Sequence, residues 1–210
     1  MSDESMRYPL FYSDLFIKSN VGTKKQRKDL LDKINYLKKN NIDIASESNE
    51  GCFRSTYRYG EELNWLRDEV SNFTQSICKY YVEQDQKLKM HMTEQTQQIH
   101  LSIWTNVNEP GSTNDIHSHK IANFACTYNL QTEGTGNLVF SNPANLLSDC
   151  NQKSPFIRNY KIEPKDGDLL IWPAWVPHYV EENKSNKQRI NIATNIKLVD
   201  KNAIIINEGG

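Results

Sequence analysis

Apolar residues recur at helical spacing in two segments of the first half of the chain. Between Lys24 and Lys39, leucine and isoleucine return every three or four positions, and the polar pair Asn40-Asn41 follows. Between Glu61 and Glu83 a longer apolar stripe has the same period. Such stripes are typical of amphipathic helices that bury one face. We therefore predict two helices over these ranges, with their apolar stripes packed into a core.

After about Met92 the pattern changes to alternation of apolar and polar residues, interrupted by turn residues. Gln98 to Val107 is the clearest alternating run, and alternation of this kind indicates a β-strand. An edge strand that contains a proline is predicted at Tyr8–Ile17. Further strands are predicted at Ile121–Leu130, Asn137–Ser141, Phe156–Ile162, Asp168–Trp172, Pro177–Glu181 and Arg189–Val199.

This order of elements predicts a mainly β (α+β) fold. Two helices followed by about seven short strands favour a double-sheet jelly roll with helices packed on one sheet. At 210 residues the chain is long enough for one well-cored domain and too short for two full ones. We expect a single domain over residues 1–210, with N-terminal helical support over about 1–92 and a jelly-roll core over about 93–200.

Composition restricts the partners more than the fold. The 25 basic and 26 acidic residues are well mixed and give a formal charge of -1, so no electrostatic feature favours binding to nucleic acid or to an anionic membrane. The N-terminus has no signal-like apolar run, and the four scattered cysteines are typical of reduced thiols. We predict a cytoplasmic protein, in the host cytoplasm if the source is viral, and a homodimer is compatible with the sequence.

Three histidines form the candidate metal site. On a β-strand His117 and His119 would point to the same face, and His178 follows 59 residues after His119. Imidazole suits iron, zinc, copper or nickel, and three protein ligands leave positions open for substrate and water. The spacing therefore predicts a catalytic metal site. Asp115, which would share the facing of His117, is the alternative second ligand.

The last long strand carries a polar row that begins at Arg189. Arg189, Asn191, Ala193 and Asn195 alternate with apolar residues. The polar row is either the solvent face of the sheet or the interior of the jelly roll. In the interior, Arg189 would need an anionic partner, most naturally a ligand carboxylate held by its planar fork, and Asn191 would add a polar contact.

A linked set of short motifs spans roughly Ser48 to Lys197. After the segment Ser48–Ser55 come Trp104-x-Asn106, Pro110-Gly111, His117-Ser-His119, Thr127-Tyr128-Asn129-Leu130, Gly136-x-Leu138-Val139-Phe140, Gly167-Asp168-Leu169-Leu170-Ile171-Trp172-Pro173, Val176-Pro177-His178 and Arg189-Ile-Asn191-Ile-Ala193. As a set they resemble 2-oxoglutarate- and Fe(II)-dependent oxygenases of the prolyl-hydroxylase-like superfamily, from a group found in marine bacteria and their viruses.

The resemblance implies a double-stranded β-helix that holds Fe(II) through His117, His119 and His178. It implies a dioxygenase that uses 2-oxoglutarate and O2 to hydroxylate a small-molecule or peptide substrate, with release of succinate and CO2. The residues it implies for binding 2-oxoglutarate are Arg189, Asn191, Asn106 and Tyr128. His119 departs from most of the superfamily, which carries Asp or Glu there, and so leaves the site one charge more positive.

Three other functions are compatible with the same residues. A cupin-like metalloprotein would share the fold without needing Arg189. A zinc hydrolase or lyase would use the three histidines and a metal-bound water, with no need for oxygen. A non-enzymatic jelly-roll module would stack a sugar or a peptide on Trp104, Trp172 or Trp175.

Overall fold

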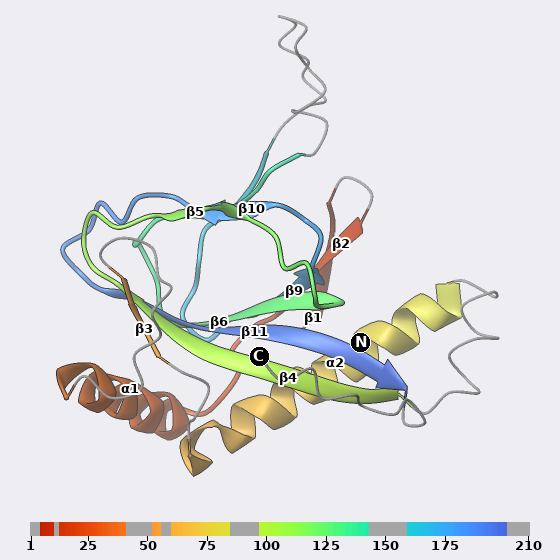
Figure 1. Cartoon of the computed structure of the whole chain (residues 1–210), viewed down its shortest axis with the longest axis horizontal. Helices are drawn as coiled ribbons and strands as arrows, with labels where there is room; N and C mark the ends of the chain where they lie inside the picture. The colour runs from red at the N-terminus through yellow and green to blue at the C-terminus, as the bar shows by residue number, and fades with distance from the viewer. Residues whose placement is uncertain are drawn as a thin grey trace, which may run out of the picture.

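Two β-sheets face each other, and two helices pack on the outer face of the larger sheet (Figure 1). The computed structural model describes residues 5–10, 13–40, 52–55, 60–84, 97–142 and 159–200. All paired strands are antiparallel. The predicted jelly roll with helices on one sheet is confirmed.

The seven strands of the larger sheet come from both halves of the chain. In order across the sheet they are β1 (Ser5–Leu10), β2 (Ser13–Lys18), β9 (Leu169–Pro173), β6 (Phe124–Gln131), β11 (Arg189–Asp200), β4 (Gln97–Asn108) and β3 (Cys52–Arg54). The four strands of the smaller sheet are, in order, β5 (Asn114–His117), β10 (His178–Val180), β7 (Leu138–Phe140) and β8 (Tyr160–Ile162). The centre of the larger sheet is β6-β11-β4, where the two longest strands pair along their whole length.

Both helices form where the apolar stripes predict them. Helix α1 (Lys24–Lys39) begins at a capping box, in which Thr23 accepts from the Gln26 backbone N–H and Gln26 accepts from the Thr23 backbone N–H. The second stripe starts as a 3-10 turn, η1 (Glu61–Leu63), and continues as α2 (Asn64–Gln84). No helix in the described ranges is long and apolar enough to cross a membrane.

Strand β11 divides the interior into two parts. Its apolar row, Ile190, Ile192 and Ile196, packs in one cluster with the buried faces of both helices. The polar row faces the other way, into the space between the two sheets, where Arg189 lies almost fully buried. The alternative that this row is the solvent face of the sheet is therefore wrong. A second apolar cluster, which includes Leu15, Leu138, Phe140, Leu170 and Trp172, fills the rest of the inter-sheet space.

Two features of the N-terminal part differ from the prediction. Tyr8–Ile17 contains two strands and not one, since β1 pairs antiparallel with β2. Strand β3 adds to the far edge of the sheet. The part predicted as helical support therefore also supplies three strands, and its predicted boundary near residue 92 lies outside the described residues.

Two strands are absent from the sequence prediction. β3 has only three residues and β5 only four. No residue of either strand is fully buried, and neither strand carries an alternating apolar pattern. Of the predicted strand Phe156–Ile162, residues 159–162 fall in the described part of the chain, and Tyr160–Ile162 forms β8. The short polar strand β5 matters most, since it ends at the first histidine of the predicted site.

The packing of the helices on the larger sheet should contribute to the free energy of unfolding independently of the cavity between the sheets. Leu66 in α2 is 1% exposed and lies between the helix and the larger sheet. Leu66→Ala should lower the free energy of unfolding by about 2–5 kcal/mol, because it removes buried methyl groups and leaves a cavity. Urea denaturation followed by circular dichroism measures this. Gln75→Ala, on the exposed side of the same helix, is the matched control, and an equal loss in both variants would contradict this packing.

Candidate metal centre

The candidate site is a cavity of about 610 Å³ between the two sheets. Its floor is the inner face of the larger sheet, with Asn106 from β4, Thr127 from β6 and the polar row of β11. Its other wall comes from β5, β7 and β10 of the smaller sheet. All three predicted histidine ligands line this cavity.

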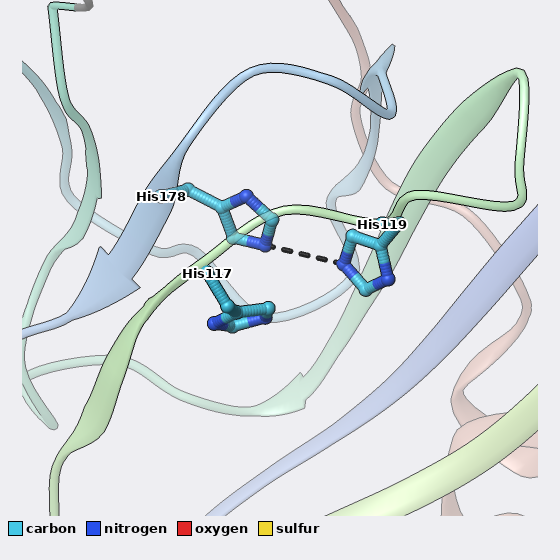
Figure 2. A group of neighbouring side chains, drawn as sticks. All are labelled: His117, His119 and His178. Atoms are coloured by element: carbon cyan, nitrogen blue, oxygen red, sulfur yellow. Dashed lines mark hydrogen bonds between the residues drawn. The ribbon is translucent and has the colours of Figure 1, made fainter.

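The three histidines converge from two strands and one loop (Figure 2). His117, the last residue of β5, is the direct pairing partner of His178, the first residue of β10. His119 lies beyond the end of β5, and its backbone N–H donates to the Ala174 carbonyl at 2.9 Å. The prediction that alternation along one strand brings His117 and His119 together is therefore wrong. A loop hydrogen bond brings His119 back toward the other two.

The nitrogen atoms lie close enough to share one ion. Each histidine offers one ring nitrogen within 4.8 Å of the other two, and Nε2 of His119 is 3.3 Å from Nε2 of His178. Two nitrogen ligands at about 2.1 Å from a metal and at right angles to each other would be about 3 Å apart. The donor set thus fits a single metal ion.

Backbone carbonyls fix the orientation of two of the rings. Nδ1 of His117 is 2.7 Å from the Asp115 carbonyl oxygen, and Nδ1 of His178 is 3.0 Å from the Val176 carbonyl oxygen. A carbonyl only accepts, so each Nδ1 carries the proton and each Nε2 is left with a free lone pair. This is the usual support of a metal-binding histidine.

Burial keeps two of the imidazoles neutral. It lowers the pKa of His178 to about 3 and that of His119 to about 4, and the neighbouring charge of His117 acts in the same direction. Both rings are therefore unprotonated at neutral pH, which is the form that binds metal.

Asp115, the alternative ligand, lines the cavity but is outside the nitrogen cluster. Its contribution to the cluster is the backbone carbonyl that orients His117. The geometry thus groups His119, and not Asp115, with His117 and His178.

Arg189 is the second unusual group of the cavity. Its side chain is buried, and Nη1 donates to the Gly136 carbonyl oxygen at 2.9 Å and to Thr135 Oγ1 at 3.3 Å. Nε is buried without a hydrogen-bond partner. Burial lowers the pKa of Arg189 to about 10, so it stays charged at neutral pH. Within the described residues no carboxylate forms an ion pair with it.

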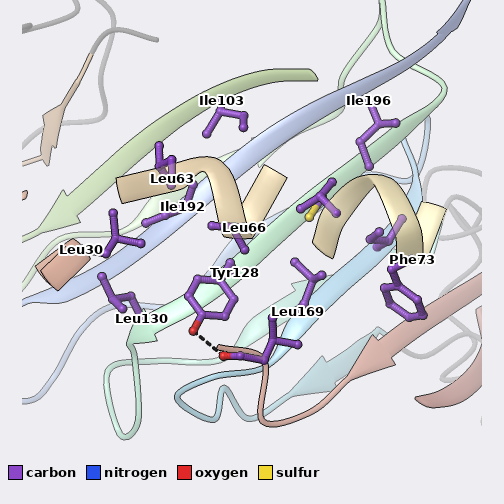
Figure 3. Packing of buried hydrophobic residues seen from close by; sticks show 14 of the residues in the cluster. Leu30, Leu63, Leu66, Phe73, Ile103, Tyr128, Leu130, Leu169, Ile192 and Ile196 are labelled. Carbon is purple, nitrogen blue, oxygen red and sulfur yellow. Dashed lines mark hydrogen bonds between the residues drawn. The ribbon is translucent and has the colours of Figure 1, made fainter. Parts of the chain in front are cut away.

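Two of the three remaining predicted residues line the cavity, and one does not. Asn191 and Asn106 do, and Asn191 Nδ2 donates to Thr127 Oγ1 at 3.0 Å. Tyr128 was predicted to contact the cosubstrate, but it faces the helices, where its hydroxyl donates to the Val21 carbonyl at 2.8 Å (Figure 3). Adjacent strand residues point to opposite faces, so Thr127 takes the inward position.

Two further cavity residues, Arg54 and Trp104, lie within the motifs that carry the family resemblance but were not predicted to bind the metal or 2-oxoglutarate. The Arg54 guanidinium carbon is 4.8 Å from the centroid of the Trp104 ring, and that ring is 6.0 Å from the ring of His119. Alternation along Gln98–Val107 places Trp104 and Asn106 on one face, which was the available signal for Trp104. No comparable pattern marks Arg54, since β3 is too short.

The comparisons with known proteins agree with this geometry. Residues 102–195 match the family described as "Putative 2OG-Fe(II) oxygenase". The resemblance noted from the motifs is thereby confirmed over the segment that contains the three histidines and Arg189. A comparison with curated protein sequences gives no match.

Solved structures share the fold at low sequence identity. A prolyl hydroxylase from Trichoplax adhaerens, in complex with a peptide of hypoxia inducible factor, has a TM-score of 0.61 at 13% identity, over 87% of this chain and 83% of that chain. AviO1 from Streptomyces viridochromogenes Tue57 has a TM-score of 0.59 at 14% identity, over 90% and 91%. HygX from Streptomyces hygroscopicus, with nickel and 2-oxoglutarate bound, has a TM-score of 0.54 at 8% identity, over 87% and 82%.

The placement of Tyr128 predicts a purely structural role. Tyr128→Phe removes the hydroxyl that donates to Val21 and should lower the free energy of unfolding by about 1 kcal/mol. Affinity for 2-oxoglutarate, measured by isothermal titration calorimetry on the metal-loaded protein, should be unchanged. Thr127→Val, on the cavity side of the same strand, is the comparison. A weaker affinity in Tyr128→Phe than in Thr127→Val would restore the original assignment.

The second ligand can be tested by metal binding alone. His119→Ala should lower the affinity for Fe(II) or Co(II) sharply, since it removes one of three ligands, and His119→Asp should retain the metal through a carboxylate. Asp115→Asn should bind metal like the wild type, because its backbone carbonyl still orients His117. Anaerobic calorimetry measures all three, with the exposed His100→Ala as control. Loss of metal in Asp115→Asn together with retention in His119→Ala would reverse the assignment.

Proposed function

We propose that this chain is a 2-oxoglutarate- and Fe(II)-dependent dioxygenase that hydroxylates its substrate. His117, His119 and His178 would hold the iron, and Arg189 would bind the distal carboxylate of 2-oxoglutarate. The observation that carries the proposal is the buried Arg189, which has no carboxylate partner among the described residues and lies in the same cavity as the histidines. Burying an unpaired cation costs several kcal/mol, so this cavity is suited to an anionic ligand.

The histidine set supports the metal part of the proposal. Three imidazoles suit Fe(II) and leave coordination positions open for a chelating cosubstrate. When bound there, the iron and 2-oxoglutarate would activate O2, which is the oxidant: one oxygen atom would enter the substrate and the other succinate, with release of CO2. HygX holds nickel and 2-oxoglutarate on the same fold, which is consistent with this use of the cavity.

The residues around Arg189 would orient the cosubstrate. The Gly136 carbonyl and Thr135 hold one end of the guanidinium, so the remaining N–H groups have a fixed direction. The linked pair Asn191 and Thr127 offers further hydrogen-bonding groups on the floor of the cavity.

Apolar side chains complete the wall on which the cosubstrate would lie. Leu138 and Trp172 are both buried and line the cavity. An apolar wall excludes water and strengthens the polar interactions inside the site.

The alternative functions account for fewer of these features. A zinc hydrolase or a cupin-like protein would use the three histidines but has no need for a buried arginine beside them. A binding module that stacks ligands on tryptophan would have no need for the histidine cluster. The cytoplasmic location, the homodimer and the absence of nucleic-acid partners stay predictions from the sequence.

The test is cosubstrate binding at the metal in the absence of oxygen. Under nitrogen, Fe(II) and 2-oxoglutarate together should give a weak charge-transfer band in visible light that neither gives alone, because chelation needs open metal positions. Arg189→Ala should weaken 2-oxoglutarate by about 2–5 kcal/mol, since it leaves one carboxylate of the ligand unpaired. Arg189→Lys should recover part of that loss, because it keeps the charge but not the fork.

Iron affinity provides the internal control for this prediction. Direct calorimetry with Fe(II) should give the same affinity in wild type, Arg189→Ala and Arg189→Lys, since Arg189 is not a ligand. Absence of the band at saturating iron and 2-oxoglutarate, together with tight retention of zinc, would favour the hydrolase.

A further inference from the structure

The cavity extends beyond the groups assigned to iron and 2-oxoglutarate. Apart from the histidines, the lining residues with a formal charge are Arg189, Arg54 and Asp115. Once Arg189 is assigned to the cosubstrate, one basic and one acidic side chain remain. They are the candidates for contact with the substrate that is oxidised.

Arg54 reaches the cavity from the edge of the larger sheet. It lies on β3 opposite Asn106 of β4, with its guanidinium over the ring of Trp104. The Trp104 ring is itself 6.0 Å from the His119 ring, so it connects Arg54 with the histidine cluster. Stacking on an indole fixes the plane of a guanidinium, whose N–H groups donate within that plane.

Asp115 reaches the cavity from the smaller sheet. It lies on β5 two residues before His117 and lines the cavity, and the register of β5 against β10 shifts between Asn114 and His117. In the part of the chain that the structure describes, its carboxylate forms no hydrogen bond or ion pair. The backbone carbonyl alone is used, to orient His117.

Arg54 and Asp115 lie at the same end of the two facing sheets. β3 and β5 are both edge strands, and a hydrogen bond from Asn108 Nδ2 of β4 to Asn114 Oδ1 of β5 joins the two sheets there. Cys52 on β3 donates to the same Asn108. The two charges therefore line the cavity from opposite walls, with neutral amides of Asn106 and Asn114 also in the lining.

We propose that this end of the cavity binds a zwitterion, with a carboxylate at Arg54 and an ammonium group at Asp115. The substrate would be a free amino acid or a short peptide with free ends. This inference rests on the proposed function, because it leaves Arg189 to 2-oxoglutarate. If the substrate were a dicarboxylate, one of its carboxylates would be repelled by Asp115. If it were a diamine, one of its ammonium groups would be repelled by Arg54, so both classes are disfavoured.

The experiment measures binding to the complete cosubstrate complex. Wild-type protein with Fe(II) and 2-oxoglutarate under nitrogen is titrated in a calorimeter with each proteinogenic L-amino acid and with unblocked dipeptides. The best ligand is then measured again as its N-acetyl derivative and as its methyl ester. Each blocked form should bind on the order of tenfold more weakly than the free form, because each loses one charge contact.

Variants assign each charge to its partner. Asp115→Asn should weaken the free ligand on the order of tenfold and bind the N-acetyl form as the wild type does. Arg54→Gln should weaken the free ligand on the order of tenfold and bind the methyl ester as the wild type does. Arg54→Lys should keep most of the preference for a free carboxylate over the methyl ester. Glu182→Gln, an exposed acid outside the cavity, is the matched control.

The outcomes separate this inference from the proposed function. If the charge-transfer band forms but no free amino acid or dipeptide binds, or if blocked forms bind as well as free ones, the zwitterion assignment is overturned and the oxygenase stands. If free dipeptides bind and single amino acids do not, the substrate is a peptide end. If the band itself does not form, the proposed function fails and the inference fails with it.

Discussion

The alternation of β11 is the constraint on which both the core and the cavity depend. Every second residue of this strand packs against the helices, and the residues between them, from Arg189 to Asn195, line the cavity. A slip of one residue against β4 or β6 would move the arginine into the apolar cluster and an isoleucine into the site. The pairing of β11 with both neighbours therefore fixes the fold and the position of Arg189, the proposed cosubstrate-binding group, at the same time.

The helix layer explains why one face of this strand can be so polar. Apolar burial that stabilises the larger sheet is concentrated on its outer face, under α1 and α2. The inner face can then carry a buried cation and several amides, whose desolvation costs free energy. A jelly roll without the helices would have to bury more apolar area between its sheets, where the cavity lies.

Sequence periodicity predicted the long elements because each of them repeats its pattern over several turns or pairs. The helix at Lys24–Lys39 and the faces of β11 follow from periodicity alone. β3 and β5 are too short to show a period, and they carry Arg54, Asp115 and His117. Tyr128 shows a different limit of sequence-based prediction. The motif locates the strand segment, but only the pairing with β11 decides that Thr127 and not Tyr128 points into the cavity. Convergence of His119 depends on a loop hydrogen bond to Ala174, which leaves no pattern in the sequence.

The neutral imidazole of the proposed ligand His119 connects the proposed metal centre with the proposed substrate site. An aspartate in its place would put a negative charge beside Trp104 and Arg54, and a substrate carboxylate approaching Arg54 would meet that charge. With histidine there, the neighbourhood of Arg54 holds no carboxylate from the ligand set. The carboxylate that the cavity does contain, Asp115, lies on the opposite sheet and is outside the nitrogen cluster. The exchange of a ligand carboxylate for imidazole thus separates the negative and positive ends of the cavity, as recognition of a zwitterion requires.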